Sequence, residues 1–164
     1  MQILNEKQIR QKIKRLAIEI LENNYSEKEI ILAGINNTGL TFAEALVNEL
    51  LNLRDMPITL TRLQINPAKP LKDDILLEMP LKDVKKKVII LVDDVANTGR
   101  TLFYATKPFM EILPKKIEVA VLVDRKHKSF PIRVDYVGMS LATTVKENIQ
   151  VIFKEDEALA VHLH

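Results

Sequence analysis

The chain of 164 residues contains no cysteine and no tryptophan, and aromatic residues make up only 5% of it. Without cysteine it has neither a disulfide framework nor a thiolate metal site. No apolar run approaches the length of a membrane span, and the first 15 residues are charged and lack the apolar core of a signal peptide. We therefore expect a cytoplasmic protein with no membrane segment.

An excess of charge of one sign is also missing, because 24 basic residues stand against 22 acidic ones and leave a formal net charge of +2. This balance gives no general reason for binding nucleic acid, so any basic patch must be local. The composition, 47% hydrophobic and 28% charged, is that of a globular chain rather than a disordered one. The length suits one domain that spans residues 1–164, with a single sizeable core.

Helical and strand patterns alternate along the chain. Apolar residues recur at helical spacing over residues 5–22 and 38–51. Strands are predicted at residues 29–33, 57–63, 88–92 and 117–123, with shorter candidates at 134–137 and 150–153. A further helix is predicted at residues 101–113, where Pro108 must kink it or lie near its start. This order predicts an α/β fold, a Rossmann-like parallel sheet flanked by helices.

Residues 66–80 break this alternation. They contain Pro67, Pro70 and Pro80, several charges and few aromatic residues. We expect a long loop or flap, because loops of this length in a compact domain are usually functional or disordered. A cover over a binding site and a mobile surface connection remain equally compatible with the composition.

The strongest signal is the segment VIILVDDVANTGRT, residues 88–101. A buried strand ends, two adjacent carboxylates follow, and a short polar turn leads into a helix. At the carboxyl end of a parallel strand such a turn lies where α/β proteins bind ligands, and free N–H groups at a helix start attract anions. Neighbouring carboxylates would repel a phosphate but accept hydrogen bonds from sugar hydroxyls. The segment therefore predicts a site for a phosphorylated ribose; the alternative is a strand–turn–helix whose aspartates cap the helix in solvent.

Several segments of the chain resemble one family. VDDVANTGRT resembles the phosphoribosyl diphosphate (PRPP) signature of type I phosphoribosyltransferases. Residues 3–20 (ILNEKQIRQKIKRLAIEI), 31–39 (ILAGINNTG) and 119–141 (VAVLVDRKHKSFPIRVDYVGMSL) are similar to one branch of that family. That branch is the pyrimidine operon attenuation regulator with uracil phosphoribosyltransferase activity. The similarity implies a type I phosphoribosyltransferase fold with a flexible flap and a small hood.

The resemblance also implies the roles of individual residues. Asp93 and Asp94 would be the catalytic pair that holds the ribose hydroxyls. The 5′-phosphate would be bound by Ala96, Asn97, Thr98, Gly99, Arg100 and Thr101. The pyrophosphate loop would consist of Gly34, Ile35, Asn36, Asn37, Thr38 and Gly39, and the base hood would include Val123, Asp124 and Arg125. Mg²⁺ would arrive with PRPP, held by few protein ligands, so no protein metal site is expected. A homo-oligomer, a dimer or larger, would be the functional form.

Two departures from the family pattern bear on the activity. Residues 34–39 contain no basic side chain, whereas family members usually have one there. Loss of a charge-assisted hydrogen bond would weaken PRPP binding by about 1.5–3 kcal/mol. Lys69 and Lys72 are alternative cations, or solvated lysines of the loop. Purine enzymes commonly have an aspartate at the position of Asn97, and an asparagine cannot act as a base, which favours a pyrimidine acceptor without identifying uracil.

Three functions remain open. The first is transfer of the phosphoribosyl group to a nucleobase, with uracil favoured. The second is an RNA-binding pyrimidine operon regulator, and the third is a nucleotide- or PRPP-binding protein with impaired catalysis. A basic surface for RNA could be formed by Lys7, Arg10, Lys14, Arg15, Arg125, Lys126, His127, Lys128 and Arg133. Ile18 replaces a histidine that the regulators use for RNA, so we rank enzyme activity first. His162 and His164, near the end, are expected to be merely solvated.

Overall fold

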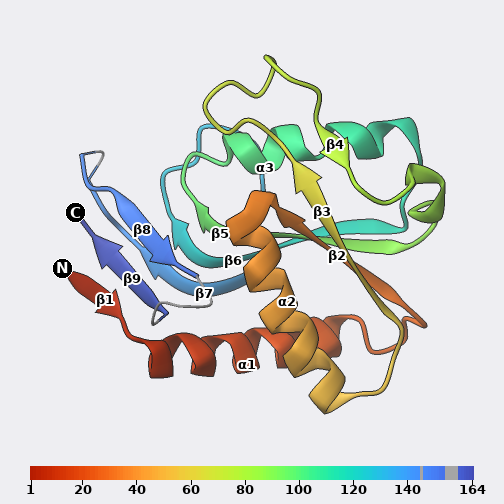
Figure 1. The fold of residues 1–164 in the computed structure, drawn as a ribbon, viewed down its shortest axis with the longest axis horizontal. Helices are drawn as coiled ribbons and strands as arrows, with labels where there is room; N and C mark the ends of the chain where they lie inside the picture. Colours follow the sequence, from red (N-terminus) through yellow and green to blue (C-terminus); the bar gives the residue numbers. More distant parts are fainter. Residues whose placement is uncertain (145, 154–158) are drawn as a thin grey trace.

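The computed structural model describes residues 1–144, 146–153 and 159–164. Its centre is a six-stranded sheet with the order β4-β3-β2-β5-β6-β7 (Figure 1). The strands are β2 (Ile30–Ile35), β3 (Ile58–Gln64), β4 (Leu76–Leu77), β5 (Val88–Ala96), β6 (Lys116–Arg125) and β7 (Tyr136–Leu141). All neighbours are parallel except β4, which pairs antiparallel with β3 at the edge. The predicted α/β fold with a largely parallel sheet is confirmed.

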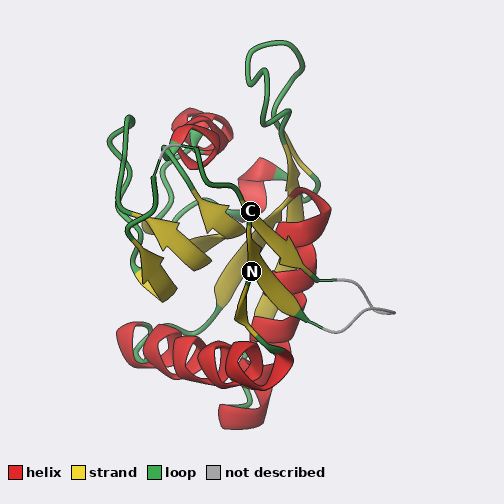
Figure 2. Ribbon diagram, turned by 90° about the vertical axis from the view of Figure 1, so that its left-hand side faces the viewer, coloured by secondary structure: helices red, strands yellow, loops and turns green. Residues whose placement is uncertain are grey.

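Helices cover both faces of this sheet (Figure 2). The helices α1 (Glu6–Asn23) and α2 (Asn36–Leu53) pack on one face, and α3 (Arg100–Ala105) packs on the other. The chain continues from α3 into a 3-10 helix, η2 (Lys107–Glu111), and another short 3-10 helix, η1 (Leu81–Asp83), precedes β5. The helix predicted at residues 101–113 is therefore much shorter, because Pro108 cannot donate the backbone hydrogen bond of a continuing α-helix.

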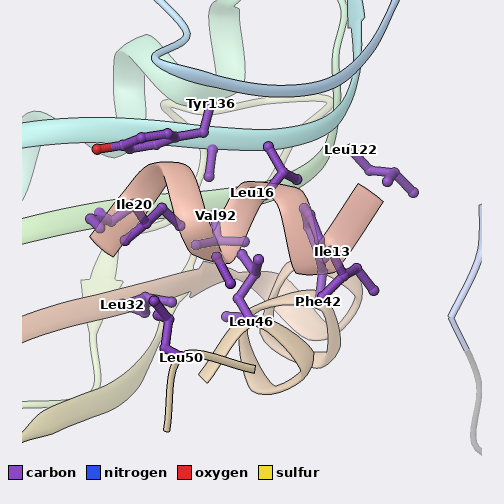
Figure 3. Packing of buried hydrophobic residues seen from close by; sticks show 14 of the residues in the cluster. Ile13, Leu16, Ile20, Leu32, Phe42, Leu46, Leu50, Val92, Leu122 and Tyr136 are labelled. Atoms are coloured by element: carbon purple, nitrogen blue, oxygen red, sulfur yellow. The ribbon is translucent and has the colours of Figure 1, made fainter. Parts of the chain in front are cut away.

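The side chains of β5 show how one strand serves both layers. Ile90 and Val92 join the core beneath α1 and α2, whereas Ile89 and Leu91 join the core beneath α3. Successive residues of a strand point to opposite faces, so a continuous apolar run is required when both faces are covered. Figure 3 shows the first of these cores, where side chains from both helices meet those from the sheet.

A second, three-stranded antiparallel sheet brings the two ends of the chain together. Its order is β1 (Gln2–Leu4), β9 (Ala160–Leu163) and β8 (Ile149–Ile152). The strand predicted at residues 150–153 corresponds to β8, whereas the sequence pattern predicted neither β1 nor β9. His162 lies within β9 and is half-buried, and the ring of His164 lies 3.2 Å from the side-chain oxygen of Gln150. The prediction that both histidines are merely solvated was wrong for His162, whereas His164 is exposed as expected.

Three other boundaries differ from the prediction. β5 does not end before the aspartates but continues through Asp93 and Asp94 to Ala96. Residues 34–39 form no separate loop, because β2 ends at Ile35 and α2 begins at Asn36. The expected flap at residues 66–80 contains the short strand β4. Among the described residues, no helix is long and apolar enough to cross a membrane.

Candidate functional site

The carboxyl ends of the parallel strands bring the predicted segments to one edge of the sheet. The register pairs Gly34 of β2 with Val92 of β5, and Ala96 of β5 with Asp124 of β6. The start of α2, the end of β5 and the end of β6 are therefore neighbours although they lie far apart in sequence (Figure 1). This edge, on both sides of the central strand, is where open α/β sheets bind ligands.

A cavity of about 360 Å³ lies at the end of β5. It is lined by Pro67, Asp93, Val95, Ala96, Asn97, Thr98, Gly99, Arg100, Thr101 and Leu102. The structure thus gathers the whole predicted 5′-phosphate segment, together with one of the two aspartates, around one space. Asp94 follows in the strand and is only half-buried, but it is not part of this lining.

Asp93 is unusual because its carboxylate is almost completely buried, with 9% of the residue exposed. Burial raises the pKa of Asp93 well above 3.8, and the adjacent charge of Asp94 raises it further. Its Oδ1 accepts a hydrogen bond of 2.9 Å from the backbone N–H of Asp94, which partly offsets these effects. A buried acid that faces a polar cavity is a candidate for binding donors of a ligand.

The turn after β5 presents its backbone to the same cavity. Gly99 has a φ of 83°, a left-handed conformation that residues with a side chain seldom adopt. A Cβ atom there would also lie 2.7 Å from Cγ2 of Ile132. Within the described residues, the backbone N–H groups of Thr98, Gly99 and Thr101 donate no hydrogen bond, whereas that of Arg100 donates to Oγ1 of Thr98 at 3.3 Å. Because α3 has only six residues, these N–H groups rather than a long helix dipole would attract an anion.

We predict that crystals grown with sulfate or phosphate will contain an ordered anion at residues 97–101. The free N–H donors form a concave anion site there. The measurement is difference density at the turn, with crystals grown without these anions as the control. An anion bound only elsewhere, with the turn unchanged, would contradict the assignment.

Asn36 joins the start of α2 to the end of β3. Its side-chain amide donates to the carbonyl of Ile65 at 2.9 Å and accepts from the N–H of Ile65 at 3.0 Å. Asn36 also has a φ of 54°, which asparagine tolerates better than most residues. The side chain of Asn36, which was predicted to meet pyrophosphate, is therefore hydrogen-bonded to the backbone of Ile65, the residue that follows β3.

A second cavity, of about 780 Å³, lies beside the start of α2. Its lining consists of Asn36, Asn37, Arg62, Gln64, Ile65, Asn66, Asp73, Asp74 and Leu76. Of the predicted pyrophosphate residues, only Asn36 and Asn37 reach it. Gly34, Ile35 and Gly39 are buried where α2 packs on the sheet; a Cβ at Gly34 would lie 2.3 Å from the Cα of Leu40. These residues shape the site without lining the cavity.

The three residues expected in the base hood have different surroundings. Val123 is fully buried, with its side chain in the core, and its place in the base hood stays a prediction. The carboxylate of Asp124 pairs with the ammonium of Lys128 at 2.5 Å. Arg125 connects three segments. It donates to Oδ1 of Asn97 at 3.2 Å, to Oγ1 of Thr143 at 2.7 Å and to the carbonyl of Thr144 at 2.7 Å.

The beginning of the expected flap is tied to residues 96–101, the turn predicted to bind phosphate. Nη2 of Arg100 donates to the carbonyl of Pro67 at 2.7 Å, and Pro67 lines the cavity at the end of β5, which we call the phosphate cavity after its predicted ligand. The Arg100 side chain thus holds the flap over the turn. Lys69 and Lys72 are both exposed and line neither cavity. They do not replace the missing cation of the pyrophosphate segment in this conformation.

The basic residues that could have formed one RNA surface are divided between the two sides of the sheet. Residues 126–133 pack on the α3 side, where the Phe130 ring lies 5.7 Å from that of Phe103. The helix α1 packs on the opposite side, and its Arg10 and Arg15 pair with glutamates of the same helix at 2.6 and 3.0 Å. These two groups of basic residues therefore lie on opposite faces of the sheet, and a basic surface that binds RNA stays a hypothesis.

Comparison with known proteins agrees with this geometry. Residues 1–155 match the family of phosphoribosyl transferase domains. The chain belongs to this family. Proteins named bifunctional protein PyrR are among its relatives. That of Ligilactobacillus salivarius is 36% identical over 163 residues, covering 94% of this chain and 92% of the relative. That of Clostridium acetobutylicum is 35% identical over 173 residues, covering 99% and 96%.

Solved phosphoribosyltransferase structures share the fold at lower sequence identity. The hypoxanthine phosphoribosyltransferase of Trypanosoma cruzi superposes with a TM-score of 0.78 and 19% identity, over 98% of this chain and 95% of that one. A hypoxanthine-guanine phosphoribosyltransferase of Bacillus anthracis has a TM-score of 0.73 and 21% identity, over 85% and 81%. The expected type I phosphoribosyltransferase fold is thereby confirmed.

Two residues of this site, Arg62 and Thr143, were not predicted from the sequence to bind a ligand or to position another site residue. Arg62 lines the second cavity, and Thr143 is buried against Arg125. For Arg62 a signal existed, because it replaces an apolar residue in the series Ile58, Leu60, Arg62 on one face of β3. For Thr143 there was none, since its partner lies 18 residues away in sequence.

Proposed function

We propose that this phosphoribosyltransferase transfers the phosphoribosyl group of PRPP to a nucleobase, with uracil the favoured acceptor, and releases pyrophosphate. The observation that supports the proposal most is the cavity shared by the buried carboxylate of Asp93 and the turn 96–101. A ribose 5-phosphate has an anionic end and a neutral end rich in hydroxyl groups. The cavity offers N–H donors for the first and a carboxylate acceptor for the second.

In the proposed reaction a ring nitrogen of the base forms a bond with C1′ while the bond from C1′ to pyrophosphate breaks. The electron pair leaves with pyrophosphate, and the nitrogen passes its proton to water or to the departing pyrophosphate. The transition state has positive charge on the ribose, so the reaction requires alignment and charge stabilisation rather than a covalent nucleophile. The side chain of Asp94 next to Asp93 would stabilise that charge, and Asp93 would orient the sugar by accepting from its hydroxyl groups.

The residues present fit a magnesium ion that arrives with the substrate. Within the described residues, no group of three or more histidine, cysteine or acidic side chains is arranged to hold a metal. Asp73 and Asp74 line the second cavity and could contribute one or two oxygen ligands. Mg²⁺ retains several waters and phosphate oxygens when bound, and it would neutralise charge on the departing pyrophosphate.

The residues expected near the acceptor base favour a pyrimidine over a purine. Oδ1 of Asn97 accepts from Arg125, so this position provides a fixed amide and no base that could take a proton from a purine. The relatives named bifunctional protein PyrR support the same choice, whereas the hypoxanthine enzymes named above share less than 25% identity and inform only the fold.

The test is an assay of pyrophosphate release from PRPP and Mg²⁺ with uracil, cytosine, orotate, hypoxanthine, guanine and adenine, each supplied separately. We expect release with uracil alone. Release with a purine would overturn the choice of acceptor. Binding of PRPP and uridine monophosphate without release for any base would instead establish a binding protein with impaired catalysis.

Regulation through RNA is the second candidate, supported by the relatives' description as bifunctional. The basic groups lie on opposite sides of the sheet, and on α1 Lys7 and Lys14 line a shallow surface pocket that RNA could use. A binding titration with pyrimidine-operon leader RNA, compared with Lys7→Gln and Lys14→Gln, separates this function from the enzyme activity.

A further inference from the structure

The second cavity lies beside the start of α2, the segment expected to meet pyrophosphate, yet that segment has no cation. α2 has no side-chain cap and no acidic residue in its first turn. Pyrophosphate bound there would require positive charge from elsewhere. Arg62 is the only cation among the described residues that line this cavity, which also contains Asp73 and Asp74.

The position of Arg62 follows from the sheet. It pairs in register with Gly34 of β2, and its side chain lies on the same face as the start of α2. Nη1 donates to Oδ1 of Asn37 at 2.7 Å, so the guanidinium is in direct contact with the first turn of that helix. The sheet therefore supplies a cation where the helix lacks one.

Glu78 holds the other side of this guanidinium. β4 runs antiparallel to β3, and the N–H of Glu78 donates to the carbonyl of Arg62 at 3.0 Å. The Glu78 carboxylate pairs with Nη2 of Arg62 at 2.5 Å, with the two side chains 30% (Arg62) and 46% (Glu78) exposed. Ion pairs this exposed contribute little to stability, so a stronger anion can displace the carboxylate at small cost. A guanidinium has five N–H donors in a plane, a geometry suited to phosphate oxygens.

We propose that Arg62 binds the pyrophosphate of PRPP, in place of the basic residue missing from residues 34–39, and that Glu78 holds it ready until the substrate arrives. This inference rests on the proposed function, because it assigns one part of the same substrate. Asp73 and Asp74 beside the cavity repel free pyrophosphate, so the ligand is its magnesium complex.

The test is calorimetric titration of three probes: magnesium PRPP, magnesium pyrophosphate and uridine monophosphate. In Arg62→Gln we expect affinity for the first two to fall about 10- to 100-fold, the loss expected for a charge-assisted hydrogen bond. Affinity for uridine monophosphate, which has no pyrophosphate, should be unchanged. Arg10→Gln is the matched control, because it removes the same charge from an exposed ion pair on α1 and should change none of the three.

Two further variants separate binding from a structural role. Glu78→Gln removes the competing carboxylate and should tighten magnesium pyrophosphate, whereas a purely structural ion pair would leave its affinity unchanged. Adding Asn37→Arg to Arg62→Gln should restore PRPP affinity by placing a charge on the neighbouring turn. If Arg62→Gln does not fold, Glu78→Gln alone decides between the two roles.

Several results would overturn the inference. One is an unchanged affinity for PRPP in Arg62→Gln, and another is an equal loss for PRPP and uridine monophosphate. If the wild-type protein binds uridine monophosphate but not PRPP, the assignment of Arg62 to pyrophosphate is wrong, whereas the assignment of the 5′-phosphate site at residues 96–101 is retained. If it binds neither, the proposed function fails and the assignment of Arg62 with it.

Discussion

Asp93→Asn combined with Asp94→Asn is expected to weaken binding of PRPP and of uridine monophosphate about 100-fold or more while the protein remains folded. Each carboxylate that accepts from a sugar hydroxyl contributes about 1.5–3 kcal/mol to affinity, and the two act on the same ribose. Titration calorimetry measures the loss, and circular dichroism checks the fold. Asp55→Asn, an exposed aspartate outside both cavity linings, is the charge-matched control. Wild-type affinity in the double variant would remove these aspartates from the site.

The single variant Asp93→Asn should bind more weakly and yet unfold at a higher temperature than the wild type at neutral pH. Burial raises the pKa of Asp93 in the folded protein above its value of 3.8 in the unfolded chain. The folded state therefore binds the proton more tightly, and stability from this group is lost as the pH rises through the raised pKa. Asparagine resembles the protonated acid and avoids this loss.

The measurement is Tm against pH for both proteins. The stabilisation by Asp93→Asn should be largest above the raised pKa and should disappear as the pH falls below 3.8, where Asp93 becomes protonated in both the folded and the unfolded state. A difference in Tm that is independent of pH would show that the buried charge is not its cause. Such a gain in stability together with a loss of binding is typical of residues kept for function rather than for folding.

Gly99→Val is expected to abolish tight binding of every ligand that has a 5′-phosphate, with a loss of about 100-fold or more. At a φ of 83° a β-branched residue is strongly disfavoured, and a Cβ would lie 2.7 Å from Cγ2 of Ile132. The turn must therefore change shape, and it would lose more than one N–H donor to the phosphate, each worth about 1.5–3 kcal/mol toward a charged group. The free energy of unfolding should also fall, by about 1–3 kcal/mol.

The variant Gly138→Ala separates the loss of phosphate binding from the loss of stability. A Cβ at Gly138 would lie 2.5 Å from the carbonyl oxygen of Leu122, so this variant is destabilised too, but Gly138 lies in β7 outside the lining of the phosphate cavity. Chemical denaturation measures the stability of both variants, and phosphate titration measures binding. We expect only Gly99→Val to lose phosphate affinity; an equal loss in both would attribute it to instability.

The elements that could be predicted from sequence are those whose pattern is local. The helical spacing in residues 5–22 corresponds to α1, which spans Glu6–Asn23, and the β-branched run 88–92 lies within β5. The Asn5 side chain caps α1 by accepting a hydrogen bond from the N–H of Gln8. Such a cap can be predicted from sequence, because its two residues are only three positions apart. Short strands such as β1 and β9 could not be predicted, because each has three or four residues and is stabilised by a partner at the other end of the chain.

For the candidate site, the sequence by itself determined that a polar turn with two adjacent aspartates follows a central strand, and it predicted a ribose-phosphate segment there. Gly99 and the aspartates support this prediction, because a tight turn and its donors are built from consecutive residues. Only the tertiary structure decided that Asp93 faces the cavity, that Asn36 clamps Ile65 and that Arg62 lies against Asn37. The physical reason is that these contacts join residues of different elements. Strand register and helix packing create them, and no short-range pattern in the sequence encodes either one.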